Sequence, residues 1–134
     1  MSFVPHPTGS LAPFDKTPRT RLVFGGGSLA CLGDLARELG GQRILLVTDR
    51  GIVRAGHVSR AVEYLTEAGL TSTVFDAVRE NPTTEDVARC LAVARESKVD
   101  LMVGLGGGSS MDTAKGTNFL LTNGVGTRHW RLAA

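Results

Sequence analysis

Three consecutive glycines, Gly106, Gly107 and Gly108, are the residues whose type and spacing most clearly indicate chemistry. They follow the apolar run at residues 101–105 and precede Ser109, which opens a segment with helical spacing. Because glycine lacks a Cβ, the backbone there can turn sharply and lie close to a ligand. A helix that starts after such a turn presents unpaired amide N–H groups and the positive end of its dipole. The pattern therefore predicts a phosphate-binding loop.

This loop differs from two well-known phosphate-binding motifs. A Walker loop has the pattern Gly-x-x-x-x-Gly-Lys-Ser/Thr, and Lys115 lies too far into the expected helix to match it. Gly104 and Gly106 agree with the start of the dinucleotide fingerprint, but Ser109 occupies the place of its third glycine. An ordinary strand-to-helix turn with Ser109 as the helix cap also fits, and it does not exclude a ligand.

Asp49 is the second candidate for a ligand contact, because it directly follows an apolar run at residues 43–48. A carboxylate there can accept hydrogen bonds from both hydroxyls of an adenosine ribose, and it would repel a 2′-phosphate. It therefore favours NAD over NADP. The acid of the standard fingerprint follows the glycines, whereas Asp49 precedes them, so spacing alone does not assign this role. A turn-forming aspartate or a cap for the segment near Gly51 is the alternative.

The elements that would position these residues alternate between strand and helix. Apolar and β-branched runs predict strands at residues 20–24, 43–48, 71–75 and 99–105. Helical spacing predicts helices at residues 28–39, 57–68, 83–97 and 109–121, with Ser28 and Thr83 as caps. The alternation predicts an α/β domain, with an open, mostly parallel, Rossmann-like sheet and helices on both faces. Right-handed crossovers then bring the loops at Asp49, Asn81 and Gly106 to one edge, where such sheets bind ligands.

Composition and charge narrow the class of protein. The 134 residues fit one domain, and a net charge of +2 with one Trp, one Tyr and five Phe disfavours nucleic acid as a partner. No apolar stretch is long enough to span a bilayer, and the N-terminus does not resemble a signal peptide. We therefore expect a cytoplasmic protein without a membrane partner.

The side chains that ligate metals are scattered through the sequence. His6, His57 and His129 lie far apart and no carboxylates cluster with them, so we expect no metal site. Cys31 and Cys90 show no metal or redox spacing. Each cysteine lies beside apolar neighbours in an expected helix, so we expect two buried free thiols.

The longer string around the glycines, Gly106-Gly-Gly-Ser-Ser-Met-Asp-Thr-Ala-Lys-Gly116, closely resembles the cofactor loop of the iron-containing (group III) alcohol dehydrogenase family. Residues 23–28 resemble the family's first strand and turn, residues 46–49 the end of its second strand, and residues 81–83 its Asn-Pro loop. The resemblance covers residues 18–124. It implies the fold of the N-terminal domain of a dehydroquinate synthase-like protein, and NAD as the cofactor.

The resemblance implies a cofactor site and no catalytic residue in this chain. The site residues would be Asp49, Asn81, Gly106, Gly107, Gly108, Ser109 and Asp112. Asn81 would border the nicotinamide, and the amides of residues 107–109 would bind the pyrophosphate. Asp112 also fits a cap that faces Ser109 and is stabilised by Lys115 three residues later.

The domain organisation follows from the same comparison. Residues 1–19 would form a loose arm, residues 20–124 the NAD-binding domain, and residues 125–134 a tail that does not match the family's continuation. In the family, the aspartate and histidines that hold iron or zinc belong to a second domain after this point. We hypothesise that a frameshift or premature stop created the tail.

These expectations concern binding and activity together. The chain would bind NAD(H) but be inactive alone, because the metal and most of the substrate pocket would belong to the second domain. Alcohol or aldehyde would be a partner only of a full-length relative. We expect self-association through the apolar face that the second domain would cover. Two other functions stay open: a non-catalytic nucleotide- or phosphate-binding module, and an enzyme on a flavodoxin-like sheet with a phosphate-bearing ligand.

Overall fold

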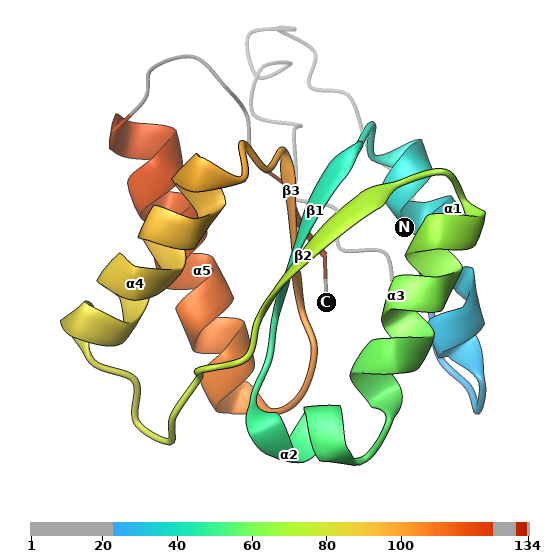
Figure 1. Ribbon diagram of the computed structural model, residues 1–134, viewed down its shortest axis with the longest axis horizontal. Helices are drawn as coiled ribbons and strands as arrows, with labels where there is room; N and C mark the ends of the chain where they lie inside the picture. Colours follow the sequence, from blue (N-terminus) through green and yellow to red (C-terminus); the bar gives the residue numbers. More distant parts are fainter. Residues whose placement is uncertain (1–22, 125–130, 134) are drawn as a thin grey trace, which may run out of the picture.

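The computed structural model describes residues 23–124 and 131–133, in which four parallel strands form one sheet with the order β2-β1-β3-β4 (Figure 1). The strands are β1 (Arg43–Val47), β2 (Thr71–Phe75), β3 (Leu101–Gly104) and β4 (Arg131–Ala133). The helices are α1 (Leu32–Glu38), α2 (Arg50–Arg54), α3 (His57–Glu67), α4 (Thr84–Glu96) and α5 (Gly108–Gly124), and a 3-10 helix, η2 (Ser28–Cys31), precedes α1.

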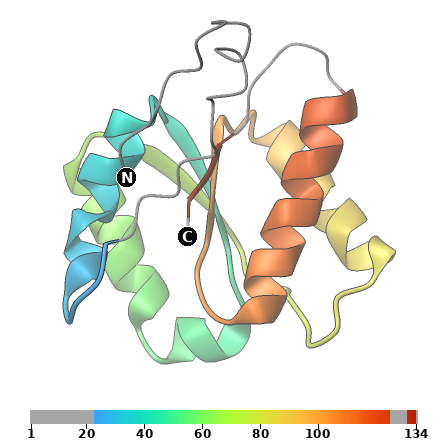
Figure 2. The ribbon, with the colours of Figure 1, turned by 180° about the vertical axis from the view of Figure 1, so that it is seen from behind.

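Helices cover both faces of the sheet. Figure 1 shows α1 and α3 on one side and α4 and α5 on the other, and Figure 2 shows the same layers from behind. The strand β1 packs against both layers. Ile44 and Leu46 belong to the apolar cluster with α1 and α3, and Leu45 and Val47 to the cluster with α4 and α5. An unbroken apolar run is needed here because alternate side chains enter opposite layers. The predicted parallel α/β fold is confirmed.

Several local predictions are confirmed as well. The strands β1, β2 and β3 and the helices α3, α4 and α5 lie close to their predicted ranges. Thr83 caps α4 in a capping box, in which its Oγ1 accepts from the Asp86 amide at 3.3 Å and the Asp86 carboxylate accepts from the Thr83 amide at 2.8 Å. Gly40 ends α1 with a φ of 80°, in the left-handed region that favours glycine.

The N-terminal part differs from the prediction. Ser28 does not cap a helix, because it is the first residue of η2, and the cap position is occupied by Gly27 without a side-chain hydrogen bond. Val23 and Phe24 belong to no strand, and the rest of the strand expected at residues 20–24 lies outside the described residues, as does the expected arm at residues 1–19. Cys31 is exposed, so the prediction of a buried thiol is wrong for it, while Cys90 is buried as expected. The buried face of α1 begins one residue later, at Leu32.

The opposite end of the chain adds the strand β4 beside β3, formed by residues 131–133 of the expected tail. None of the described helices has the length and apolar character needed to cross a bilayer. On α5, Phe119 is 65% exposed and Leu120 is 41% exposed. Self-association through an apolar face stays a prediction.

Candidate functional site: the loops between β1 and β3

The order of the strands defines a crevice at the carboxyl ends of β1 and β3. From β1 the chain crosses to β2 on one side, and from β2 it crosses back over β1 to β3 on the other side. The connections of two neighbouring strands thus leave in opposite directions, and open α/β sheets bind ligands at such a switch point. Asp49 lies two residues after β1, and Gly106 two residues after β3.

Hydrogen bonds hold these two loops together. The Leu105 amide donates to the Val47 carbonyl at 2.9 Å, and the Thr48 hydroxyl donates to the Leu105 carbonyl at 2.8 Å. As a result, Asp49 Oδ2 lies 3.6 Å from the point where a Cβ on Gly106 would be. The sequence predicted the convergence, but it gave no sign of the role of Thr48, whose partner lies 57 residues away.

Asp49 uses one carboxylate oxygen for the fold and leaves the other available. It is the N-cap of α2, a helix that the sequence did not reveal, and its Oδ1 accepts from the Ile52 amide at 2.9 Å. The interpretation of Asp49 as a helix cap is therefore confirmed. Its Oδ2 accepts no hydrogen bond from the residues that the structure describes, and the side chain is half-buried. A carboxylate in this state can accept a hydrogen bond from a ligand hydroxyl.

The glycine loop has space on its outer side. Gly106 has a φ of 136°, which side chains other than hydrogen rarely permit, and a Cβ there would lie 3.0 Å from Ser110 Oγ. At Gly107 and Gly108, no atom lies within 4 Å of the place that a Cβ would occupy. All three glycines are exposed. The loop therefore forms a cradle that ligand atoms can approach down to the backbone.

The start of α5 supplies donors to this cradle. The Met111 amide donates to the Gly107 carbonyl at 3.2 Å, which makes Gly107 the cap. The amides of the next three residues, Gly108, Ser109 and Ser110, consequently have no acceptor within the helix. Ser109 is not the cap that the sequence suggested, since α5 begins one residue before it. Free amides at a helix start suit a phosphate group.

Ser110 is a member of the loop that sequence reasoning missed. Its side chain is only 1% exposed, and its Oγ has no hydrogen-bond partner among the described residues. Nothing in its spacing distinguishes it from Ser109. A buried hydroxyl without a partner destabilises a fold by about 1–3 kcal/mol. A ligand or a shift of the backbone that supplied a hydrogen-bond partner would remove this cost.

Asp112 lies away from the helix start. It is exposed and is the fifth residue of α5, so it is outside the first turn. Within the described part of the chain, no hydrogen bond or ion pair joins it to Ser109 or Lys115, and the predicted cap is wrong. The Ser109 carbonyl instead accepts from the Thr113 hydroxyl at 2.8 Å. The earlier start of α5 explains the difference.

Asn81 belongs to the loop between β2 and α4, at the same edge of the sheet. The loop is joined to β1 where the Val78 amide donates to the Thr48 carbonyl at 3.3 Å. Asn81 is exposed and has a φ of 53°, an uncommon value for a residue other than glycine. Of the three loops that the sequence predicted to converge, the structure places Asp49 and Gly106 in contact range and Asn81 farther along, in the loop that follows the neighbouring strand β2.

A buried carboxylate lies behind the Asn81 loop. Asp86 is 1% exposed, and the Thr83 amide lowers its pKa, opposed by burial and assisted by Arg79 and Arg89. The guanidinium groups of Arg79 and Arg89 both bind its Oδ1. The carboxylate is therefore ionised at neutral pH.

No three histidine, cysteine, aspartate or glutamate side chains come together within residues 23–124 and 131–133 to hold a metal ion. The described residues thus do not fit an iron or zinc ion, and no chemical step can be assigned to a metal held by them. What they present at the switch point is a carboxylate oxygen, free amides and open space.

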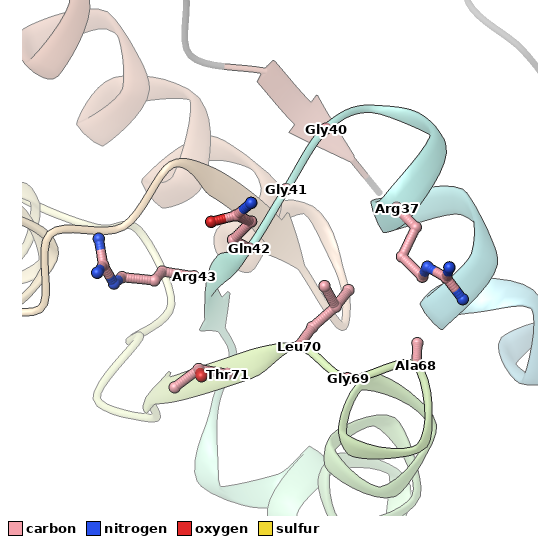
Figure 3. Close-up of a pocket in the computed structure, with 9 residues that line it drawn as sticks. All are labelled: Arg37, Gly40, Gly41, Gln42, Arg43, Ala68, Gly69, Leu70 and Thr71. Atoms are coloured by element: carbon pink, nitrogen blue, oxygen red, sulfur yellow. The ribbon is translucent and has the colours of Figure 1, made fainter.

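A cavity of about 510 Å³ lies at the opposite, amino edge of the sheet (Figure 3). Its lining residues are Arg37, Gly40, Gly41, Gln42, Arg43, Ala68, Gly69, Leu70 and Thr71. Leu70 lies in its middle, whereas Arg37 and Arg43 lie on opposite sides and point apart. Because its polar groups do not converge, this cavity lacks the arrangement typical of a ligand site.

The fold and the site define a doubly wound α/β domain with a glycine loop at its switch point. The profile of a family described as iron-containing alcohol dehydrogenase matches residues 18–133. The chain belongs to the iron-containing alcohol dehydrogenase family. The matched range extends into residues 125–134, and the frameshift or premature stop stays a prediction.

Individual relatives agree with this assignment. The chain is 38% identical to a 1,3-propanediol dehydrogenase of Klebsiella pneumoniae over 75% of its own length and 26% of the relative. It is 30% identical to the NADH-dependent butanol dehydrogenase A of Thermotoga maritima, with a TM-score of 0.70 over 74% of this chain and 25% of that one. A sulfoacetaldehyde reductase of Bifidobacterium kashiwanohense in complex with NAD+ is 28% identical, with a TM-score of 0.70 over 81% and 32%. The chain spans about a quarter of the length of the curated relatives it matches.

Proposed function

We propose that this chain is the NAD-binding part of a metal-dependent alcohol dehydrogenase, an oxidoreductase that interconverts alcohols and aldehydes by hydride transfer. The proposal rests on one observation: a free carboxylate oxygen of Asp49 lies beside an open glycine loop at the switch point of the sheet. Two similar proteins of known structure, one described as NADH-dependent and one in complex with NAD+, support the choice of dinucleotide.

The pyrophosphate would lie over the glycine loop. The amides of residues 108–110 have no acceptor in α5, and the open space at Gly107 and Gly108 lets phosphate oxygens approach them. Hydrogen bonds to a charged group contribute about 1.5–3 kcal/mol each. The positive end of the helix dipole adds to this attraction. The chain thus binds the anionic centre of the dinucleotide without a lysine.

Asp49 and Asn81 would contact the two ends of the cofactor. Asp49 Oδ2 accepts a hydrogen bond from the adenosine ribose and repels a 2′-phosphate, so NAD binds in preference to NADP. Asn81 presents an exposed amide from the loop after the neighbouring strand β2, and the family resemblance assigns it to the nicotinamide side. When bound, NAD supplies the carbon that accepts or donates the hydride. The alcohol or aldehyde and the metal are assigned to parts of a family member other than the residues described.

A titration of the 134-residue chain with NADH, followed by NADH fluorescence, tests the proposal. We expect saturable binding that Gly107→Val weakens about tenfold or more, because loss of one charge-assisted hydrogen bond corresponds to at least a factor of ten. Gly26→Val is the matched control. It places the same side chain in a second triple-glycine turn, also with no atom within 4 Å of the new Cβ. Thermal melting confirms that both variants fold.

The outcomes separate the proposed function from a general phosphate-binding module. Preference for NADH over NADPH and over inorganic pyrophosphate supports a dinucleotide site. Tighter binding of another phosphate compound, lost equally in Gly107→Val, would favour the module instead, since free amides recognise any phosphate. Equal NADH affinities of wild type and Gly107→Val would show that the glycine loop is not part of the NADH site.

A further inference from the structure

The loop that carries Asn81 contains a strained residue at its tip. Asn81 has a φ of 53°, and Asn tolerates this left-handed conformation better than most residues but at a cost in energy. Its side chain is exposed and forms no hydrogen bond within the described ranges. Strained residues of this kind persist only where the surrounding structure holds them. Something other than Asn81 itself must therefore fix this turn.

Asp86 holds the chain on both sides of Asn81. On the C-terminal side, its Oδ2 accepts from the Thr83 amide at 2.8 Å and from the Thr83 hydroxyl at 3.1 Å. On the N-terminal side, its Oδ1 accepts from Arg79 Nε at 3.1 Å and from Arg79 Nη2 at 2.9 Å. Arg79 and Thr83, the two residues that Asp86 binds here, are each two positions from Asn81. One carboxylate thus closes a short loop with Asn81 at its centre.

Burial and several hydrogen bonds hold the Asp86 carboxylate in one position. It is 1% exposed and is anchored in the first turn of α4, and Arg89 from the next turn binds its Oδ1 as well. Hydrogen bonds between ionised partners are roughly twice as strong as neutral ones. The side chains of Arg79 and Arg89 are 61% and 55% exposed, so the fixed point of the cluster is the carboxylate.

This cluster connects to the cofactor edge through the start of the same loop. The Val78 amide donates to the carbonyl of Thr48, the residue directly before Asp49. The loop is therefore attached to β1 at one end and to Asp86 at the other. The turn at residues 80–82, with Asn81 at its centre, lies between the attached residues.

We propose that Asp86 is a positioning residue for cofactor binding, which holds Asn81 in the geometry that the bound nicotinamide requires. This inference rests on the proposed function. Asp86 does not touch the cofactor. It acts by removing the freedom of the turn before binding, so that no affinity is lost in ordering it.

A second carboxylate, the half-buried Asp100, supplies a control. Asp100 accepts from the Gln42 amide at 2.9 Å and from the Arg43 amide at 3.0 Å, at the amino edge of the sheet. Like the Asp86 carboxylate, the Asp100 carboxylate accepts hydrogen bonds from backbone amides of residues that are not adjacent to it in the sequence. It lies at the edge remote from Asp49, Asn81 and Gly106. A purely structural role for Asp86 predicts the same behaviour for Asp86→Asn and Asp100→Asn.

The experiment measures NADH affinity and melting temperature for wild type and both variants of the 134-residue chain, well below the lowest melting point. We expect both substitutions to lower the melting temperature. Asp86→Asn should weaken NADH binding about tenfold, and Asp100→Asn should change it less than twofold. Equal affinities for Asp86→Asn and wild type, or equal losses in both variants, would overturn the proposal.

A double-mutant cycle identifies the residue through which Asp86 acts. Asn81→Gly removes the amide while glycine accepts the left-handed backbone, so it should weaken NADH binding without lowering the melting temperature. In that background, Asp86→Asn should cause no further loss of affinity. Losses that multiply, or full NADH binding by Asn81→Gly, would refute the role. If wild type shows no saturable NADH binding, the proposed function falls, and this inference falls with it. If wild type binds NADH and Gly107→Val weakens that binding but Asp86→Asn does not, the proposed function stands and this inference alone is overturned.

Discussion

Two glycines inside helices should respond in opposite ways to the same substitution. Glycine in a helix interior is less favourable than alanine by roughly 0.5–1 kcal/mol, so Gly→Ala stabilises a helix that has room for the methyl group. Gly33 in α1 and Gly116 in α5 differ in that room.

At Gly33 the added Cβ would lie 2.5 Å from the Tyr64 carbonyl oxygen and 2.8 Å from the Ala68 Cβ. Both atoms belong to α3 or its immediate continuation and cannot rotate away. Ordinary contacts between heavy atoms are about 3.5–4.0 Å, so α1 must move away from α3 by about 1 Å. Overpacking of this kind costs about 1–3 kcal/mol, which outweighs the helix gain.

At Gly116 the nearest atoms are the Val87 methyl carbons, at 3.3 and 3.5 Å. These are the ends of a side chain and need to shift by only a few tenths of an ångström. The helix gain should therefore exceed the packing cost. For a domain of this size, 1 kcal/mol corresponds to about 4 °C in melting temperature.

We expect Gly33→Ala to melt about 4–8 °C below wild type and Gly116→Ala at or a few degrees above it, on the scale of about 4 °C per kcal/mol. Melting followed by circular dichroism at 222 nm on the full chain measures both. The reasoning from contact distances is refuted if Gly33→Ala is as stable as wild type, or if Gly116→Ala loses as much as Gly33→Ala.

Three further outcomes are expected. Gly106→Ala should lower the melting temperature, because alanine is strained at a φ of 136° and its Cβ would meet Ser110 Oγ; equal stability in a melting curve would contradict this. Ser110→Ala should leave the melting temperature unchanged or raise it, since it removes a buried hydroxyl without a partner, and a fall would mean that the hydroxyl is bonded. Asp86 has its pKa lowered in the folded chain, so its contribution to stability is complete above about pH 4 and is lost as the pH falls through the folded pKa. Acid unfolding of Asp86→Asn should therefore depend less on pH than that of wild type, and parallel curves would exclude the cluster with Arg79 and Arg89 as a cause.

The sequence predicted those parts of the fold in which local pattern and tertiary contacts agree. The apolar run at residues 43–47 forms a strand buried on both faces, and Asp86, three residues after Thr83, forms part of a capping box. The helix α2 was missed because its five residues include Gly51 and are too few to show a period. Short helices of this kind depend on a cap and on packing rather than on propensity.

The site was predictable as far as topology reaches. Consecutive crossovers in a parallel sheet bring Asp49 and Gly106 to one edge, and the structure places them in contact range. Contacts that depend on the path of a loop were not predictable. The pairing of Asp86 with Arg79 requires the turn at Asn81, and the bond from Thr48 to Leu105 requires the register of β1 and β3. Neither condition leaves a periodic signal.

The two carboxylate oxygens of Asp49 have different tasks, and these tasks differ in how far a substitution can alter them. Oδ1 starts α2, a task that serine, threonine or asparagine can also perform. Oδ2 lies beside the glycine loop, where under the proposed function the negative charge that the carboxylate shares between its two oxygens disfavours a 2′-phosphate. A single codon change from aspartate to asparagine therefore retains the helix and alters the charge. Under the proposed function, a substitution at this position can therefore alter the preference between dinucleotides while the start of α2 is kept.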